Sequence, residues 1–170
     1  MKKRYYLFLI SYCFFGYAQE KVHDTDNHIR YAFSPGVIVQ RNVFLESNLF
    51  VGKILDETEG KIPIVGVSGF RIGIESDLNK TLAPKIGYEI AILAVTLRVT
   101  AVDYFQKTNS EFRVLPELGF CIGGWVNLTY GYGISFKESN LTDIGHHRVS
   151  LSFNLNRRLG KAAYNLVRKR

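Results

Sequence analysis

The strict alternation of apolar and polar residues is the feature that most constrains this chain. In residues 125–136 (WVNLTYGYGISF), Gly131 and Gly133 alternate with larger side chains, and Trp125 is followed on the same face by small or polar residues. The other face carries Val126, Leu128, Tyr130, Tyr132, Ile134 and Phe136. Successive side chains of a strand point to opposite faces, so a period of two indicates a β-strand with two unlike faces. The same period recurs over residues 29–156 and predicts an all-β protein.

Eight strands follow from this period. The expected ranges are 29–40, 44–55, 64–76, 82–92, 94–105, 112–122, 125–136 and 146–156. The boundary between the fourth and fifth strands is the weakest, because residues 90–95 contain no Gly, Pro, Asn or Asp. A tight turn within Ala91–Ala94 is predicted there, since the combined run is too long for one ordinary strand. Without that turn the count falls to seven.

The connections between these strands fall into two groups. The ones after strands three, five and seven are longer (76–81, 106–111 and 137–146), whereas those after strands four and six are short (91–94 and 123–124). Such alternation is typical of a transmembrane barrel, which has tight periplasmic turns and longer outer loops. The first two connections depart from this rule, since 41–42 is short and 56–61 is longer.

The first eighteen residues are typical of a secretory signal peptide. Met1–Arg4 is basic, Tyr5–Phe15 is apolar, and Gly16 and Ala18 are small residues suited to a cleavage site. The apolar run is too short to span a bilayer. We therefore expect an exported protein that loses residues 1–18 and keeps a polar leader over residues 19–28.

Charge and cysteine content exclude several classes. The chain carries 22 Lys and Arg against 15 Asp and Glu, a net charge of +7. The excess lies in the signal peptide and in the basic tail over residues 157–170, so no nucleic-acid partner is expected. Cys121 is the single cysteine outside the signal peptide, which excludes a disulfide-stapled module.

The polar face contains few charges among many small residues. The interior of an eight-stranded barrel is only wide enough for side chains to fill, so charges inside it must be paired. Arg-x-x-x-Glu at 71/75 and 113/117, and Lys-x-x-x-Glu at 85/89, put opposite charges on one face of one strand. The candidates for lumenal ion pairs are Arg71, Glu75, Lys85, Glu89, Arg98, Arg113, Glu117 and Arg148.

The apolar face carries aromatic residues near strand ends, as the interfacial girdles of a membrane barrel do. We expect an antiparallel up-and-down eight-stranded β-barrel of the transmembrane type, with its apolar face toward lipid. The candidate membrane-interface aromatics are Tyr31, Phe33, Tyr88, Phe112, Tyr130, Tyr132, Phe136 and Phe153. A soluble, exported, lipocalin-like barrel that binds an apolar ligand is the alternative, because alternation alone fits both orientations.

Two segments, PELGF at 116–120 and NLTYGY at 127–132, resemble small uncharacterised barrel proteins of flavobacteria. With the signal peptide and eight strands, the chain is similar to the small OmpA/OmpX-type outer-membrane barrels over roughly residues 29–156. The resemblance implies location in the outer membrane, and lipids and the barrel-assembly machinery as partners. Many such barrels end on an aromatic residue read by that machinery, whereas here Phe153 is followed by the basic tail.

No catalytic residue, metal or cofactor is expected. Residues 23–28 contain possible ligands but form part of a solvated leader. A lipid-modifying enzyme that uses His146, His147 or Ser150 is a third hypothesis, although the His-x-Ser spacing of lipid A deacylases is absent. The sequence therefore predicts a non-enzymatic integral outer-membrane barrel with a plugged polar lumen and a structural or surface-interaction role.

Two structures are possible for the basic tail. One is an amphipathic helix with Leu159, Ala163 and Leu166 on one side, which contacts anionic lipid headgroups. The other is a frayed basic end.

Overall fold

A computed structural model describes residues 28–57, 64–107, 109–136, 141 and 144–168. The predicted signal peptide and all but the last residue of the leader lie outside these residues. The described elements are β1 (Arg30–Val39), β2 (Val43–Glu57), β3 (Ile64–Ser76), β4 (Thr81–Ile92), β5 (Val95–Gln106), β6 (Asn109–Ile122), β7 (Val126–Tyr132), β8 (Ile134–Ser135), β9 (His147–Phe153) and α2 (Arg157–Arg168).

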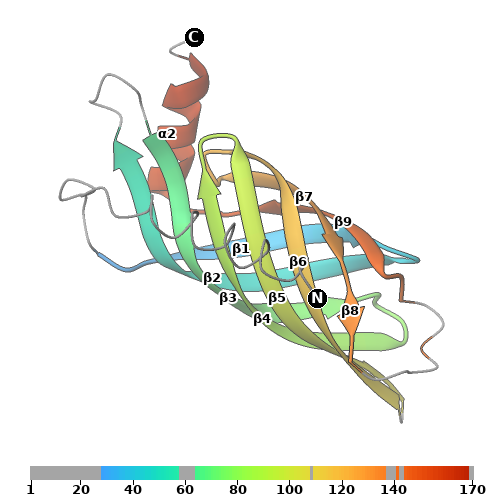
Figure 1. Cartoon of the computed structure of the whole chain (residues 1–170). Helices are drawn as coiled ribbons and strands as arrows, with labels where there is room; N and C mark the ends of the chain where they lie inside the picture. The colour runs from blue at the N-terminus through green and yellow to red at the C-terminus, as the bar shows by residue number, and fades with distance from the viewer. Residues whose placement is uncertain (1–27, 58–63, 108, 137–140, 142–143, 169–170) are drawn as a thin grey trace, which may run out of the picture.

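The strands close into an antiparallel barrel (Figure 1). From β1 to β7 each strand pairs with the next one in sequence, β7 also pairs with β9, and β9 pairs with β1 to complete the circle. β7 and β8 both pair with β6 and act as one interrupted strand, so the barrel has eight strands. The predicted all-β fold, an antiparallel eight-stranded barrel, is therefore confirmed. The interruption falls at Gly133, whose N–H donates to the carbonyl of His146 at 2.7 Å.

The turn expected within Ala91–Ala94 is present. β4 ends at Ile92 and β5 begins at Val95, with Leu93 in the left-handed region at φ 55°. The Leu93 N–H donates to the carbonyl of Val65, and the Leu93 carbonyl accepts from the N–H of Gly123, both at 2.8 Å. Hydrogen bonds with Val65 of β3 and with Gly123, which follows β6, thus hold a turn that has no turn-forming residue of its own.

The structure contradicts the expectation of a longer connection at 106–111. β5 continues to Gln106, which pairs with Asn109 at the start of β6. The polar residues of this segment are typical of a loop, but Glu111 points into the lumen and is buried there. Inward contacts therefore extend both strands, and the alternation of long and short connections does not hold at this position.

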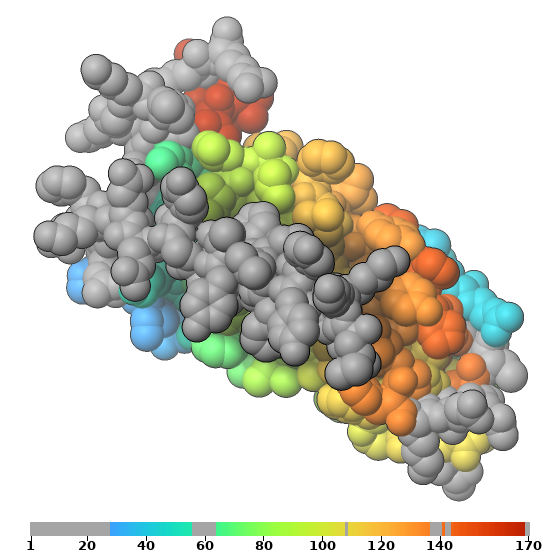
Figure 2. Space-filling view, viewed as in Figure 1, coloured from blue at the N-terminus to red at the C-terminus, as the bar shows by residue number. Residues whose placement is uncertain are grey.

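The barrel has two distinct ends. The helix end comprises the 93–94 turn, residues 123–125 and α2, and the loop end comprises residues 40–42, 77–80, 107 and the described part of 136–146. In Figure 2 the strands coloured green to orange lie side by side along the length of the molecule.

The apolar face of the strands points outward and the small, polar face points inward. Tyr130 and Tyr132 are 53% and 46% exposed, whereas Gly131 and Gly133, which alternate with them, are buried. In β4 every outward residue is apolar: Leu82, Pro84, Ile86, Tyr88, Ile90 and Ile92. The inward-facing side chains of the eight strands line the lumen, and they make up the candidate site.

Candidate functional site: a closed ring of charges in the lumen

Eight charged side chains from six strands form a closed ring inside the barrel. Each cation lies within ion-pair distance of two glutamates, and each glutamate lies within that distance of two cations. In order around the ring the residues are Glu46, Lys85, Glu75, Arg148, Glu117, Arg98, Glu89 and Arg71, which returns to Glu46. Apart from the Lys85–Glu46 contact, the N–O distances run from 2.5 to 3.7 Å.

The ring is shielded from water. Its side chains are at most 5% exposed. A buried ion costs several kcal/mol unless opposite charges and hydrogen bonds surround it. Neutral donors complete the shell, since Ser150 donates to Glu46 at 3.3 Å and Asn154 donates to Glu89 at 2.9 Å. Four cations against four carboxylates leave the ring without net charge.

A further pair lies toward the loop end. Arg113 Nε donates to Glu111 at 2.6 Å, and its guanidinium carbon lies 5.7 Å from the centre of the Tyr104 ring. Tyr104 Oη in turn donates to Glu75 at 3.2 Å. Over the described residues, the buried charged side chains are thus five cations and five carboxylates. The lumen as described is electrically balanced.

The structure places all eight predicted ion-pair candidates in the lumen, but with partners other than those suggested by spacing. Arg71 pairs with Glu89 and Glu46, not with Glu75 on its own strand. Lys85 likewise pairs with residues of β2 and β3. Residues i and i+4 of a strand lie about 13 Å apart, whereas adjacent strands are about 4.8 Å apart. Ion pairs across strands are therefore favoured over pairs along one strand.

Three contributors were absent from the predicted set, and one of them, Glu46, is a member of the ring itself. Glu111 was assigned to the connection at 106–111 and was missed for that reason. Tyr104 was missed although the period of two places it on the same face as Arg98. That period was the available signal, since Tyr104 lies within the strand expected at 94–105.

Glycine provides the space that the ring needs. A Cβ atom added at Gly131 would lie 2.6 Å from Cγ of Glu117 and 3.4 Å from Cγ of Arg148. The first of these distances is shorter than real contacts allow. A residue without a side chain is therefore needed at this inward position, next to these two long side chains.

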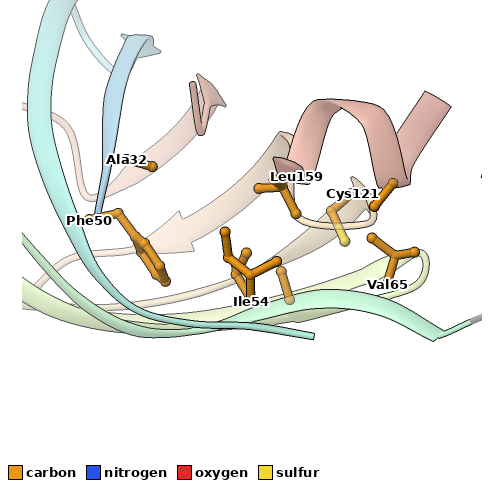
Figure 3. Packing of buried hydrophobic residues seen from close by; sticks show 9 residues of the cluster. Ala32, Phe50, Ile54, Val65, Cys121 and Leu159 are labelled. Carbon is orange, nitrogen blue, oxygen red and sulfur yellow. The ribbon is translucent and has the colours of Figure 1, made fainter. Parts of the chain in front are cut away.

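The helix end of the lumen is filled by an apolar cluster that includes α2. Figure 3 shows Leu159 of α2 reaching toward Cys121 and Val65. Ala162 is also part of this cluster, and Leu166 packs against it. The apolar side of the tail therefore packs against the barrel. The expectation of a frayed end is wrong for residues 157–168, which are helical.

Asn156 fixes the start of this helix. Its Oδ1 accepts hydrogen bonds from the N–H groups of Arg158 and Leu159 at 3.0 and 3.3 Å, which is an N-cap. Its Nδ2 donates to the carbonyl of Tyr31 at 3.0 Å. The cap thus anchors α2 to the first strand of the barrel.

A second apolar cluster fills the loop end. Leu141 and Ile144 from the long β8–β9 connection pack on Ile38, Phe44 and other buried residues. The charge ring therefore lies between two apolar plugs. Side chains fill both ends of the lumen in the described part of the chain.

The predicted interface aromatics lie on the outer face. Seven of them are 40% to 70% exposed, and Phe153 is half-buried. Phe112 and Phe136 pair at the loop end with ring centres 6.2 Å apart. The outer surface is therefore rich in exposed apolar and aromatic side chains.

The residues of the enzyme hypothesis do not come together. Ser150 is buried in the lumen and contacts Glu46, whereas His147 is exposed on the outer face, with Nδ1 2.5 Å from Tyr130 Oη. Residues an odd number apart on a strand point to opposite faces. Within the described ranges no group of three or more His, Cys, Asp or Glu is placed to hold a metal ion. No helix in those ranges is long and apolar enough to cross a bilayer.

Comparison of the chain with family models, curated proteins and solved structures finds no match. Function must therefore be inferred from the chain's own geometry. The ring neutralises every carboxylate and cation in it, so the chemistry it supports is the stabilisation of a filled lumen.

Proposed function

We propose that this chain is an integral outer-membrane barrel, related in kind to the small OmpA/OmpX-type barrels, with a structural or surface-interaction role. The observation that carries this proposal is the outer surface. Among the strand residues whose side chains are described, the outward Lys, Arg, Asp and Glu side chains are Lys53, toward the helix end, and Asp103, toward the loop end. The surface between these levels is apolar.

The extent of this surface suits a bilayer. In β4 the outward apolar residues run from Leu82 to Ile92. Ten residue steps at about 3.3 Å and a strand tilt of about 40° give a height of about 25 Å. That height equals the apolar band of outer-membrane barrels. In water the same surface would be a large aggregation liability.

The lumen supports this proposal over the soluble alternative. A lipocalin-like barrel needs an apolar interior to hold an apolar ligand and a polar exterior to face water. The described interior instead carries ten charged side chains between two small apolar plugs. A filled lumen of this kind favours an anchoring or scaffolding role over conduction of sizeable solutes.

The test is fractionation of expressing cells, followed by gel electrophoresis of the membrane pellet with and without boiling. We expect recovery in the outer membrane and a band whose migration changes on boiling, because a closed barrel resists detergent until heated. Recovery in the aqueous fraction would overturn the proposal and favour the soluble barrel.

A further inference from the structure

The outer face of the barrel is not uniform, since β4 to β7 enclose a trough with a volume of about 450 Å³. Val99 and Pro116 pair across β5 and β6 and form its floor, and Leu97 lies beside them. Tyr88 borders the trough on the β4 side, and Tyr130 and Tyr132 border it on the β7 side.

The walls of this trough are held in place from behind. Tyr88 Oη lies 2.8 Å from Ser68 Oγ, and its ring meets Phe70 edge-on with centres 5.0 Å apart. These contacts keep the Tyr88 ring from folding over the floor.

The opposite wall is supported in the same way. Tyr130 Oη lies 2.5 Å from His147 Nδ1, and Tyr132 stacks on His146 with ring centres 5.8 Å apart. His146 Nδ1 lies 3.0 Å from the Gly133 carbonyl, which fixes that imidazole in turn. A groove with walls preorganised on both sides binds a ligand at less entropic cost than one that must form on binding.

The chemistry of the lining defines the ligand. The hydroxyls of Tyr88 and Tyr130 point to Ser68 and His147, so carbon atoms face the trough. The floor is open outward, since Val99 and Leu97 are 56% and 53% exposed. A bound chain therefore touches the apolar lining on one side and the surroundings on the other, and in the proposed membrane the surroundings are apolar too. A hydrocarbon chain within a bilayer meets this requirement.

We propose that the trough is a binding site for one acyl chain of a membrane lipid, which it holds more tightly than the rest of the outer face does. This inference rests on the proposed membrane location. It assigns a lipid partner to Tyr88, Val99, Pro116, Tyr130 and Tyr132.

The test uses the full mature chain, folded in dodecyl maltoside with added palmitoyl-oleoyl phosphatidylglycerol, and counts bound lipid by native mass spectrometry. We expect one retained lipid per wild-type barrel. Val99→Trp fills the floor and should lower retention about ten-fold, whereas Leu49→Trp, at an outward site on β2 that is 47% exposed, should retain lipid as the wild type does. Tyr88→Phe removes the hydrogen bond to Ser68 that holds one wall of the trough. It should weaken retention about three-fold, as expected for loss of one hydrogen bond.

Equal retention by Val99→Trp and wild type, or no retained lipid on a wild-type barrel, would overturn the site. Leu97→Trp gives the same comparison if Val99→Trp fails to show the boiling-dependent shift of a folded barrel. A folded outer-membrane protein without retained lipid would contradict this inference alone. Recovery in the aqueous fraction would contradict the proposed function itself.

Discussion

Arg148 and Glu75 meet face to face inside the barrel although 73 residues separate them in sequence. Nη2 of Arg148 lies 2.9 Å from Oε1 of Glu75, and Nη1 lies 3.3 Å from Oε2. This two-point contact joins the last strand to β3, and Arg148 also reaches Glu117 on β6 at 3.4 Å. One side chain thus connects three regions of the barrel wall.

Removing this cation should be costly. Arg148→Met leaves two buried glutamates with one cation each, and we expect a loss of about 3 to 5 kcal/mol in the free energy of unfolding. Urea titration of the barrel in lipid vesicles, scored by the boiling-dependent gel shift, measures the loss. Lys53→Met, which removes an exposed cation, is the control and should change stability by less than about 0.5 kcal/mol.

A double mutant separates the lost pair from general damage. Arg148→Met with Glu75→Gln removes both charges together, so its cost should be smaller than the sum of the two single costs. Strict additivity would show that the two side chains do not interact.

The helix plug should control access to Cys121. This thiol is the single cysteine outside the predicted signal peptide, and it packs in the same cluster as Leu159. Leu159→Ala leaves a cavity beside it, and we expect maleimide to react with Cys121 at least about five-fold faster, because local opening becomes easier. Val167→Ala, at a residue of the same helix that is 61% exposed, is the matched control and should leave the rate unchanged.

Two glycine substitutions should have opposite effects. Gly131→Ala places a methyl group against Glu117 and should destabilise the barrel by about 1 to 3 kcal/mol. At Gly160 in α2 the nearest atom to an added Cβ is Trp125 Nε1, at an ordinary contact distance of 3.5 Å. Gly160→Ala should therefore stabilise the helix by up to about 1 kcal/mol. The urea midpoints of the two variants test the signs, and a stable Gly131→Ala barrel would contradict the packing described for the ring.

The turn at Asp77 should make a pH-dependent contribution. Oδ1 of Asp77 accepts hydrogen bonds from the backbone N–H groups of Asn79, Lys80 and Thr81. Partial burial raises the pKa of Asp77, but these hydrogen bonds outweigh it and hold that pKa below its usual range. The stabilisation is then fully present above the usual pKa of an aspartate, about 3.9, and disappears as pH falls through the lower folded pKa.

Asp77→Asn removes this charge. We expect the wild type to exceed the variant in stability at pH 7, and the difference to shrink below pH 4 as the wild-type carboxyl is protonated. Parallel urea titrations across this pH range measure it. A difference that grows as the pH falls would contradict the assignment.

The sequence was sufficient for the architecture because its period of two is local. Each inward or outward assignment depends on adjacent residues, and the face with Gly131 and Gly133 does line the lumen. The 93–94 turn was predicted from strand length alone, although bonds to Val65 and Gly123 maintain it.

The pairing within the ring was beyond the sequence. Which cation meets which glutamate depends on strand order, register and tilt, and these are set by the whole barrel. Spacing along one strand suggested Arg71 with Glu75, whereas register brings Arg71 to Glu89. The role of α2 was ambiguous for the same reason, since an amphipathic helix does not specify which apolar surface it covers.

The ring also has a consequence for the order of assembly. Strands β2 to β6 supply four glutamates and three cations, and the fourth cation, Arg148, arrives only with β9. A sheet that has not yet received its last strand therefore carries one uncompensated negative charge on the surface that must become the interior. Closure removes it. The electrostatic cost of burying the lumen is thus fully offset only when the chain has been completed, which disfavours premature sealing of an unfinished barrel.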